Sequence, residues 1–558
     1  MSSMPCNQTD TNQAAPAWHR RLQWTALSIL LLTLLLTATA SADLVNRKIS
    51  GTMPAFSDVF GVPSAQISPD SQTVVYRAEP NFDGTVELFR VSSNGSDSPV
   101  PVNGPVAQGS FLTVYAITPD GSRIVYLAPE DAAGINELYS VPFDGSSSLK
   151  LNGSLGLTGD VINFKLSPDG NWVVYWADQD ADNVLELYSV PIDRSAEPVK
   201  LNEAPVTDGD VSDFKISPDS NWVVYRADQD TDEKLELYSV PIDRNSGPIK
   251  LNGTLVANGD IVEYQISPDS SRVIYRADQG VDEQFELGTV LMNGADRHKL
   301  NETLDPDEDV TTFQISPDSS QVVYMADQDT DETFELYSVP IGDGTPVKLN
   351  GVLDTNRDVF SFKIRPDSSQ VLYLADEDIN EAYELYSVPL LGGVLPVKLN
   401  EPLVTGRRIF DFQISPDNNW VVYLADQKTD TVLELFSLPL GGGDTNTISG
   451  PMVSGGDANY DYQISSDSSR VVYEADQDID GLNELYSVPI DRSEEPAKLN
   501  GTLVSGGQVI DFHISPDSSR VVYKADQETD EQFELFVTLD EALASSDSTV
   551  YLPLVLRE

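Results

Sequence analysis

One stretch of sequence decides the fold: residues 211–241 read VSDFKISPDSNWVVYRADQDTDEKLELYSVP, and Lys250-Leu251-Asn252 follows soon after. Copies of this stretch recur along the chain with their Pro-Asp steps 49 or 50 residues apart. The aspartates at these steps are Asp70, Asp120, Asp169, Asp219, Asp269, Asp318, Asp367, Asp417, Asp467 and Asp517, and serine replaces the proline before Asp467. A fixed period of this length predicts an array of structural units that bury their apolar faces against their neighbours.

Within one copy the apolar residues alternate with period two, which indicates β-strands and not helices. The expected strands are residues 211–216, 222–227, 235–240 and 249–251, and Pro218-Asp219-Ser220 has the composition of a turn. Residues 228–233 are polar and connect the second strand to the third. Four short antiparallel strands rich in Val, Tyr and Ile predict one blade of an all-β propeller.

The Ser-Pro-Asp turn, the Val-Val-Tyr strand and the Glu-Leu-Tyr strand resemble the TolB-type, WD40-like propeller repeat. The resemblance covers nearly the whole chain after its N-terminal segment and implies a β-propeller. It implies little about function, because related blades occur in periplasmic scaffolds and in propellers attached to serine peptidases. This chain differs from the usual pattern in having ten units and an unusually Asp-rich loop between the second and third strands.

The two ends of the repeat region predict how the ring closes. The last unit ends after its third strand, residues 533–537, while Arg47-Lys48-Ile49 resembles Ala497-Lys498-Leu499. The N-terminal segment is therefore expected to supply the outer strand of the last blade and to hide a sheet edge. Residues 43–540 are thus expected to form one ring of ten four-stranded blades. Two five-bladed rings are the alternative, because ten blades exceed the usual number.

Both termini are expected to lie outside the propeller. Residues 1–42 have the pattern of a signal peptide, since His19, Arg20 and Arg21 precede an apolar run over residues 22–36, which small residues follow. An uncleaved membrane anchor is the alternative, because the run is close to spanning length. Residues 541–558 are expected to form a C-terminal tail. The chain is therefore expected to be secreted, periplasmic or on the cell surface.

Charge and cysteine content exclude several classes of function. The chain has 34 Lys and Arg residues against 89 Asp and Glu residues, a formal net charge of −55. Such a field repels nucleic acid and anionic lipid and favours cations and basic partners. The only cysteine, Cys6, lies in the expected signal segment, so disulfides and Cys-based sites are excluded from the mature chain. A protein or glycan partner on one rim is expected, and the oligomeric state stays open.

The Asp-rich loops carry the candidate metal site. Acidic residues recur at loop positions one, three, five and nine, and Gly481 follows the third aspartate of one loop, which resembles the calcium loops of integrin-type propeller blades. Alternate carboxylates in a tight turn bring their oxygens together, which suits Ca²⁺. A hairpin loop whose carboxylates face water is the alternative. The candidate ligands are Asp178, Asp180, Asp182, Glu186, Asp228, Asp230, Asp232, Glu236, Asp327, Asp329, Asp331, Glu335, Asp476, Asp478, Asp480 and Glu484.

A second set of polar residues recurs on the first strand of the unit, between an aromatic residue and an aliphatic one. These side chains are expected either to contact a ligand at the channel mouth or to pair with polar neighbours such as Asp213 and hold the blades in register. They are Lys165, Lys215, Gln265, Gln314, Lys363, Gln413, Gln463 and His513.

These patterns favour a non-catalytic binding scaffold stabilised by calcium. Outside the signal segment the only histidines are His298 and His513, and each is a variant of a repeat position. The chain after the last unit is too short for the hydrolase domain of peptidase propellers. A propeller hydrolase with an axial carboxylate or calcium site is the alternative. Such a hydrolase requires unlike acidic residues at one point of the axis, whereas nearly every carboxylate here is repeated.

Overall fold

The computed structural model describes residues 44–51, 53, 57–131, 134–156, 158–354 and 356–540. One compact unit is Asn46–Leu539, and the other consists of Met1–Val45 and Asp540–Glu558. The expected signal peptide at residues 1–42 and the expected tail at residues 541–558 lie outside the described residues. Within the described ranges, no helix is long and apolar enough to cross a membrane.

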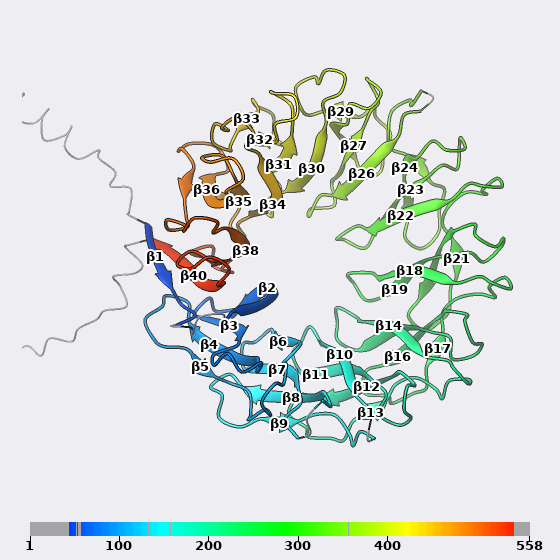
Figure 1. The fold of residues 1–558 in the computed structure, drawn as a ribbon. Helices are drawn as coiled ribbons and strands as arrows, with labels where there is room; N and C mark the ends of the chain where they lie inside the picture. Colours follow the sequence, from blue (N-terminus) through cyan, green and yellow to red (C-terminus); the bar gives the residue numbers. More distant parts are fainter. Residues whose placement is uncertain are drawn as a thin grey trace, which may run out of the picture. The chain divides into compact units, whose positions relative to one another are not determined.

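The unit Asn46–Leu539 is one ring of ten four-stranded antiparallel sheets (Figure 1). In each sheet the strands follow one another in chain order from the axis outward, except where the ring closes. We number the blades 1 to 10 in chain order, starting with the sheet that begins at β2. The prediction of one ten-bladed ring is confirmed, and the alternative of two five-bladed rings is wrong.

The strands of the ten blades have the following bounds. Blades 1 to 5 consist of β2 (Val59–Ile67), β3 (Thr73–Ala78), β4 (Glu87–Ser92), β5 (Val100–Pro101); β6 (Tyr115–Ile117), β7 (Arg123–Ala128), β8 (Glu137–Pro142), β9 (Leu149–Lys150); β10 (Val161–Leu166), β11 (Trp172–Ala177), β12 (Glu186–Pro191), β13 (Val199–Lys200); β14 (Val211–Ile216), β15 (Trp222–Ala227), β16 (Glu236–Pro241), β17 (Ile249–Lys250); β18 (Ile261–Ile266), β19 (Arg272–Ala277), β20 (Glu286–Leu291) and β21 (His298–Lys299). Blades 6 to 10 consist of β22 (Val310–Ile315), β23 (Gln321–Ala326), β24 (Glu335–Pro340), β25 (Val347–Lys348); β26 (Val359–Ile364), β27 (Gln370–Ala375), β28 (Glu384–Pro389), β29 (Val397–Lys398); β30 (Ile409–Ile414), β31 (Trp420–Ala425), β32 (Glu434–Pro439), β33 (Asn446–Thr447); β34 (Ala458–Ile464), β35 (Arg470–Ala475), β36 (Glu484–Pro489), β37 (Ala497–Lys498); β38 (Val509–Ile514), β39 (Arg520–Ala525), β40 (Glu534–Asp540) and β1 (Leu44–Lys48).

The repeated Ser-Pro-Asp turn is a small hydrogen-bonded unit between the first two strands of a blade. In blade 4, Ser217 Oγ donates to Asp219 Oδ1 (2.5 Å), and the Asn221 N–H donates to the same carboxylate (3.1 Å). The Trp222 N–H donates to Ser217 Oγ (2.9 Å). Side chains that bond their own backbone in this way favour a turn over continued strand.

The same turns join neighbouring blades. Ser220 adopts a left-handed backbone conformation (φ 63°), and its hydroxyl accepts a hydrogen bond from the Asp169 N–H of the preceding blade (3.0 Å). An equivalent bond runs from the Asp517 N–H to Ser71 Oγ (3.0 Å) and links blade 10 to blade 1. The turn therefore fixes the relative position of successive blades as well as the hairpin itself.

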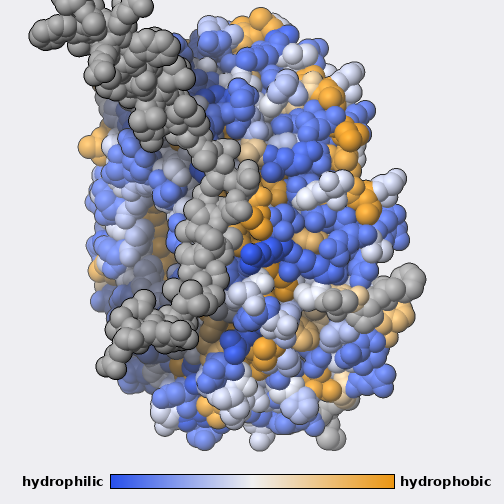
Figure 2. Space-filling view, turned by 90° about the vertical axis from the view of Figure 1, so that its left-hand side faces the viewer, coloured by the Kyte–Doolittle hydropathy of each residue, from blue (hydrophilic) through white to orange (hydrophobic). Residues whose placement is uncertain are grey.

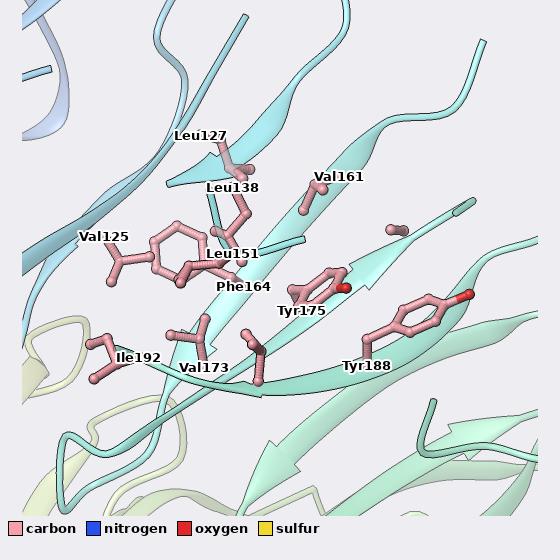
Figure 3. Packing of buried hydrophobic residues seen from close by; sticks show 12 residues of the cluster. Val125, Leu127, Leu138, Leu151, Val161, Phe164, Val173, Tyr175, Tyr188 and Ile192 are labelled. Carbon is pink, nitrogen blue, oxygen red and sulfur yellow. The ribbon is translucent and has the colours of Figure 1, made fainter. Parts of the chain in front are cut away.

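The apolar core lies between blades, as Figure 3 shows for blades 2 and 3. Val125 and Leu127 of blade 2 pack against Phe164, Val173 and Tyr175 of blade 3, and all five are at most 5% exposed. Corresponding clusters lie between the other neighbouring blades that are described. Each blade therefore buries both faces, which explains why the second strands are nearly continuous apolar runs.

The ring closes through the N-terminal strand, as the sequence predicts. Strand β1 pairs with β40 in blade 10. The Ile49 N–H donates to the Leu535 carbonyl (2.8 Å), and Lys48 Nζ lies 2.5 Å from Glu534 Oε1. Closure covers the edge of β40, which would otherwise offer unpaired backbone groups to another chain.

The visible side of the ring is mostly hydrophilic (Figure 2). Figure 2 shows one side of the molecule, on which hydrophilic residues cover most of the visible area and hydrophobic residues are scattered between them. Exposed hydrophobic side chains that stand singly are normal on soluble surfaces and indicate no binding site by themselves.

Candidate functional site

The first aspartate of each Asp loop bonds the backbone around it. Asp228 Oδ1 accepts a hydrogen bond from the Asp210 N–H (2.5 Å), and its Oδ2 accepts one from the Glu233 N–H (3.1 Å). Asp178, Asp327 and Asp476 accept equivalent pairs of bonds from the preceding interblade link and from their own loops. These carboxylates therefore hold the loop and the interblade link together.

The third and ninth positions share one lysine from the outer strand. In blade 4, Lys250 Nζ lies 3.1 Å from Asp230 Oδ2 and 2.6 Å from Glu236 Oε2. Tyr238 donates its hydroxyl to the buried Glu236 (3.3 Å). Burial disfavours the charged lysine, but its bonds to both carboxylates outweigh burial and hold the pKa of Lys250 above its ordinary value. The same arrangement joins Lys200 to Asp180 and Glu186, Lys348 to Asp329 and Glu335, and Lys498 to Asp478 and Glu484.

Blade 8 shows that the position of the lysine can change while one cation stays in the loop. There the third loop position is Lys428, and the outer strand has Thr447 where every other blade except blade 1 has lysine. Lys428 Nζ donates to Thr447 Oγ1. Blade 8 therefore lacks both the aspartate and the outer-strand lysine, whereas blade 5 has Gly280 in place of the aspartate and keeps Lys299 paired with Glu286.

The fifth positions, Asp182, Asp232, Asp331 and Asp480, are exposed. Within the described ranges, no group of three or more His, Cys, Asp or Glu side chains is placed to hold a metal ion. Each complete loop instead brings a lysine ammonium between its third and ninth carboxylates. Calcium binding by these loops stays a prediction.

The polar residues of the inner strands join each blade to the next. Lys215 Nζ donates to the Tyr264 carbonyl (2.5 Å) and lies 4.7 Å from the centroid of the Tyr264 ring. Gln265 Nε2 donates to the Phe313 carbonyl (2.9 Å) in the same way. Equivalent bonds come from Gln66, Lys165, Gln314, Lys363, Gln413 and Gln463. These side chains hold the blades in register, chiefly through backbone carbonyls and not through acidic side chains.

This series of hydrogen bonds between inner strands, which we call the ladder, changes where the ring closes. His513 occupies the ladder position of blade 10, but its Nε2 lies 3.3 Å from Asp511 Oδ2, and that carboxylate accepts a hydrogen bond from the Ser64 N–H of blade 1 (2.6 Å). Burial alone would raise the pKa of Asp511, but the bonds and charge of His513 and the bonds from Ser64 hold it below its ordinary value. The inner strands of blades 10 and 1 are therefore joined differently from the other neighbouring pairs.

A pocket of about 270 Å³ lies near this junction and is lined by residues of β30, β34, β35 and β38. Figure 1 shows where these strands lie in the ring. Glu474 of β35 lines it together with Asp461 and Tyr460 of β34 and Ile510 and Asp511 of β38. Glu474 is only 4% exposed, and its Oε1 has no hydrogen-bond partner in the described part of the chain. Burial, reinforced by the negative charge of Asp461, raises the pKa of Glu474 to about 8.

Glu474 breaks the repeat at a position where no other blade has an acid. The residue before the final alanine of the second strand is otherwise Arg77, Leu127, Trp176, Arg226, Arg276, Met325, Leu374, Leu424 or Lys524.

The inner strand of blade 9 is irregular as well. Residues 459–461 form a bulge between Ala458 and Tyr462, whereas two residues separate the equivalent Val211 and Phe214 of blade 4. The sequence analysis missed this site, because its signal is a departure from the repeat. Comparing the ten copies position by position would have revealed both the acid and the extra residue.

Comparisons with known proteins find only distant likenesses among solved structures. Neither a protein-family model nor a curated protein matches this chain. A putative TolB from Agrobacterium tumefaciens is 19% identical and covers 46% of this chain and 87% of its own, with a TM-score of 0.27. Oligogalacturonate lyase from Vibrio parahaemolyticus is 16% identical over 68% of this chain and 98% of its own, with a TM-score of 0.34. Dipeptidyl peptidase 4 from Porphyromonas gingivalis is 11% identical over 82% of this chain and 64% of its own, with a TM-score of 0.45.

The blade sequence and the ring together define the class of this protein. Each blade has the turn aspartate, which Ser-Pro precedes in seven of the ten blades, and the sheets have the strand order that the resemblance implied. The chain is therefore a β-propeller with ten four-stranded blades in one ring, and its repeat resembles the TolB-type blade.

Proposed function

We propose that this propeller is a non-catalytic binding scaffold, secreted or periplasmic, that receives a basic protein partner. The observation that carries the proposal is the distribution of acidic groups. The chain has a formal net charge of −55, and exposed aspartates recur at the fifth position of the Asp loops. A surface of one sign attracts partners of the opposite sign and accelerates their association.

The repeated carboxylates support a scaffold and not a reaction centre. Asp228 caps its loop, and Glu236 is neutralised by Lys250, with the same roles in other blades. Groups that perform one structural task in blade after blade are not the unlike acid and base that a catalytic centre requires. A glycan partner on the same rim is the other form of this proposal.

We also propose that the Asp loops bind calcium, because the spacing of their carboxylates suits Ca²⁺. The lysines that lie between the third and ninth positions are its competitors for that place.

The test is a calorimetric titration of the chain that begins at residue 43. One ligand is a peptide rich in arginine and lysine, and the control is a peptide with glutamine at every basic position. Saturable binding of the basic peptide alone, weakening with added salt and leaving the peptide intact by mass spectrometry, is expected. Equal binding of both peptides, or cleavage of either, would contradict a non-catalytic acidic scaffold.

One observation favours a hydrolase as the second candidate. Glu474 and Asp511 line the same pocket, and their pKa values are moved in opposite directions. A protonated and an ionised carboxyl group in one pocket are the parts of a general acid and base pair. Turnover of oligosaccharide or peptide substrates by the wild-type chain, abolished in Glu474→Gln, would replace the scaffold with this function.

A further inference from the structure

The propeller contains its own example of a bound guanidinium group. In blade 4, Arg226 Nε and Nη2 donate to Asp213 (3.1 and 3.0 Å). Its Nη1 donates to the carbonyls of Ile261 and Val262 at the start of the inner strand of blade 5 (2.8 and 2.9 Å). A two-pronged bond to carboxylate with further bonds to carbonyls uses the planar donor geometry of arginine.

Two further blades repeat this contact. Arg77 donates to the carbonyls of Leu112 and Thr113, and Arg276 donates to the carbonyl of Val310 (3.3 Å). Arg276 Nε also lies 3.6 Å from Glu263, which corresponds to Asp213. The interface between successive inner strands therefore binds a guanidinium group in three blades, through the first carbonyls of the next blade and, in blades 4 and 5, an acid as well.

Blade 9 keeps the acceptors of this receptor but not the guanidinium. Asp461 precedes the inner-strand aromatic residue as Asp213 does, and Val509 and Ile510 correspond in register to Ile261 and Val262. Glu474 occupies the position of Arg226. Glu474 thus stands where blade 4 has the cation Arg226, next to a second acid, Asp461, and to carbonyl oxygens.

The replacement leaves an unpaired buried acceptor. Glu474 is 4% exposed, its Oε1 has no hydrogen-bond partner in the described part of the chain, and it lines the pocket of about 270 Å³. Leaving a buried carboxyl oxygen unpaired is unfavourable, so such a group calls for a donor that is not supplied by the fold.

Aromatic side chains lie beside the acidic groups. Tyr460 is 56% exposed and lies edge-on to Phe410, with ring centroids 6.3 Å apart. The guanidinium carbon of Arg408 lies 4.8 Å from the centroid of Phe410. Exposed rings next to carboxylates suit guanidinium groups, which stack on aromatic faces while donating hydrogen bonds in their own plane.

We propose that the pocket between blades 9 and 10, lined by Glu474, Asp461 and Ile510, binds the guanidinium group of an arginine side chain from a partner peptide. This inference rests on the proposed scaffold function and names the chemical group that the scaffold recognises. The bound arginine takes the role that Arg226 has in blade 4, and it pairs with the two acids and the carbonyls that begin β38. Glu474 is the only acid at this strand position among the ten blades, so the ring contains one such site.

The test is calorimetric titration with acetyl-Gly-Arg-Gly-amide. The neutral control is the same peptide with citrulline, which keeps the shape of arginine without its charge, and free L-arginine forms a third arm. We expect one peptide per chain and no measurable citrulline binding. Tighter binding of the peptide than of free arginine identifies a peptide source for the group, and the reverse identifies a small-molecule source.

Three variants locate the site. At pH 9, where the carboxyl group of Glu474 is ionised, Glu474→Gln is expected to weaken binding of the arginine peptide about tenfold or more, since one buried ionic partner is lost. In Glu474→Arg the new guanidinium group should occupy the site itself and abolish peptide binding. The melting midpoint of this variant should be at least equal to that of the wild type. Asp182→Asn, an equal change of charge on an exposed loop, should leave binding unchanged.

Unchanged binding in Glu474→Gln, or several equivalent peptides per chain, would overturn the site. Because Glu474→Gln is nearly isosteric, it keeps the test decisive even if Glu474→Arg fails to fold. Salt-sensitive binding of a basic peptide that does not depend on Glu474 would refute this inference while leaving the acidic scaffold intact. Failure of all basic ligands to bind would refute both.

Discussion

At the scale of single residues, the same side-chain type has different roles in different surroundings. Asp219 closes a turn, Asp228 caps a loop and the exposed Asp232 faces solvent, although all three lie within one repeat. The role of Asp219 could be predicted, because Ser-Pro-Asp carries its own turn chemistry. The partner of Glu236 could not, because Lys250 lies 14 residues away on another strand and becomes its neighbour only when the blade forms.

The outer-strand lysine should stabilise its blade. Replacing Lys250 by Met leaves the buried Glu236 without its cation, and because the lysine is half-exposed we expect a loss of only roughly 1 to 2 kcal/mol in the free energy of unfolding. Urea unfolding measures this loss. Asp230→Asn, which removes the exposed partner of the same lysine, should cost less than about 0.5 kcal/mol. Equal losses in the two variants would show that Glu236 does not depend on Lys250.

Glu474 should make the stability of the ring depend on pH. Its pKa is about 8 in the folded chain against an ordinary value of 4.5, so between these values the folded state binds more protons than the unfolded state. The free energy of unfolding therefore falls as pH rises from about 4.5 to about 8. Glu474→Gln has no group that titrates here, so its free energy of unfolding should not fall in this way. At pH 9 it should exceed that of the wild type by on the order of 3 kcal/mol, with little difference at pH 4.

Urea unfolding of both proteins at the two pH values checks this expectation. Asp461 and Asp511 remain in the variant, so any pH dependence that they cause stays in both proteins. Parallel pH profiles for wild type and Glu474→Gln would mean that the carboxyl group is ionised in the folded state.

At the scale of elements, the regular strands follow from the repeat and the irregular ones do not. Strands β14 and β15 have the bounds that apolar alternation predicts, and β16 begins and ends one residue later than expected. The closing strand β1 could be predicted, because Lys48 repeats the outer-strand pattern in sequence. The bulge at residues 459–461 could not be recognised from alternation within a single repeat, since it is visible only against the other copies.

Strand β1 should be required for a monomeric ring. A chain that starts at residue 53 lacks β1 and leaves the edge of β40 unpaired, so it should melt lower than a chain that starts at residue 44 and should elute as larger species. Thermal melting and size-exclusion chromatography measure the two effects. If the shorter chain has the elution volume and midpoint of the longer one, β1 does not close the ring in solution.

At the scale of the whole molecule, a period of 49 or 50 residues was enough to predict the propeller, and the unfinished last unit was enough to predict one ring. The asymmetry of the ring needed the structure. Glu474 lies on β35, while Asp511 and Ile510 lie on β38 of the next blade, so the pocket forms only between two blades. Repeat sequences define the common blade well and reveal a unique site only through their exceptions.

Calcium is tested on the intact ring. If the Asp loops bind it, the melting midpoint after chelation should rise with added calcium and much less with magnesium, because a ligand that binds only the folded state stabilises that state. An equal response to both ions, matched by sodium chloride at the same ionic strength, would reflect screening of the negative charge. Lysines such as Lys200 and Lys250 would then be the only cations of these loops.

The most direct measurement is an experimental structure of the chain in complex with acetyl-Gly-Arg-Gly-amide. We expect density for one guanidinium group between Glu474 and Asp461, within hydrogen-bond distance of the first carbonyls of β38, in the arrangement that Arg226 has in blade 4. An empty pocket under saturating peptide, or peptide bound only on the Asp loops, would contradict the proposed site.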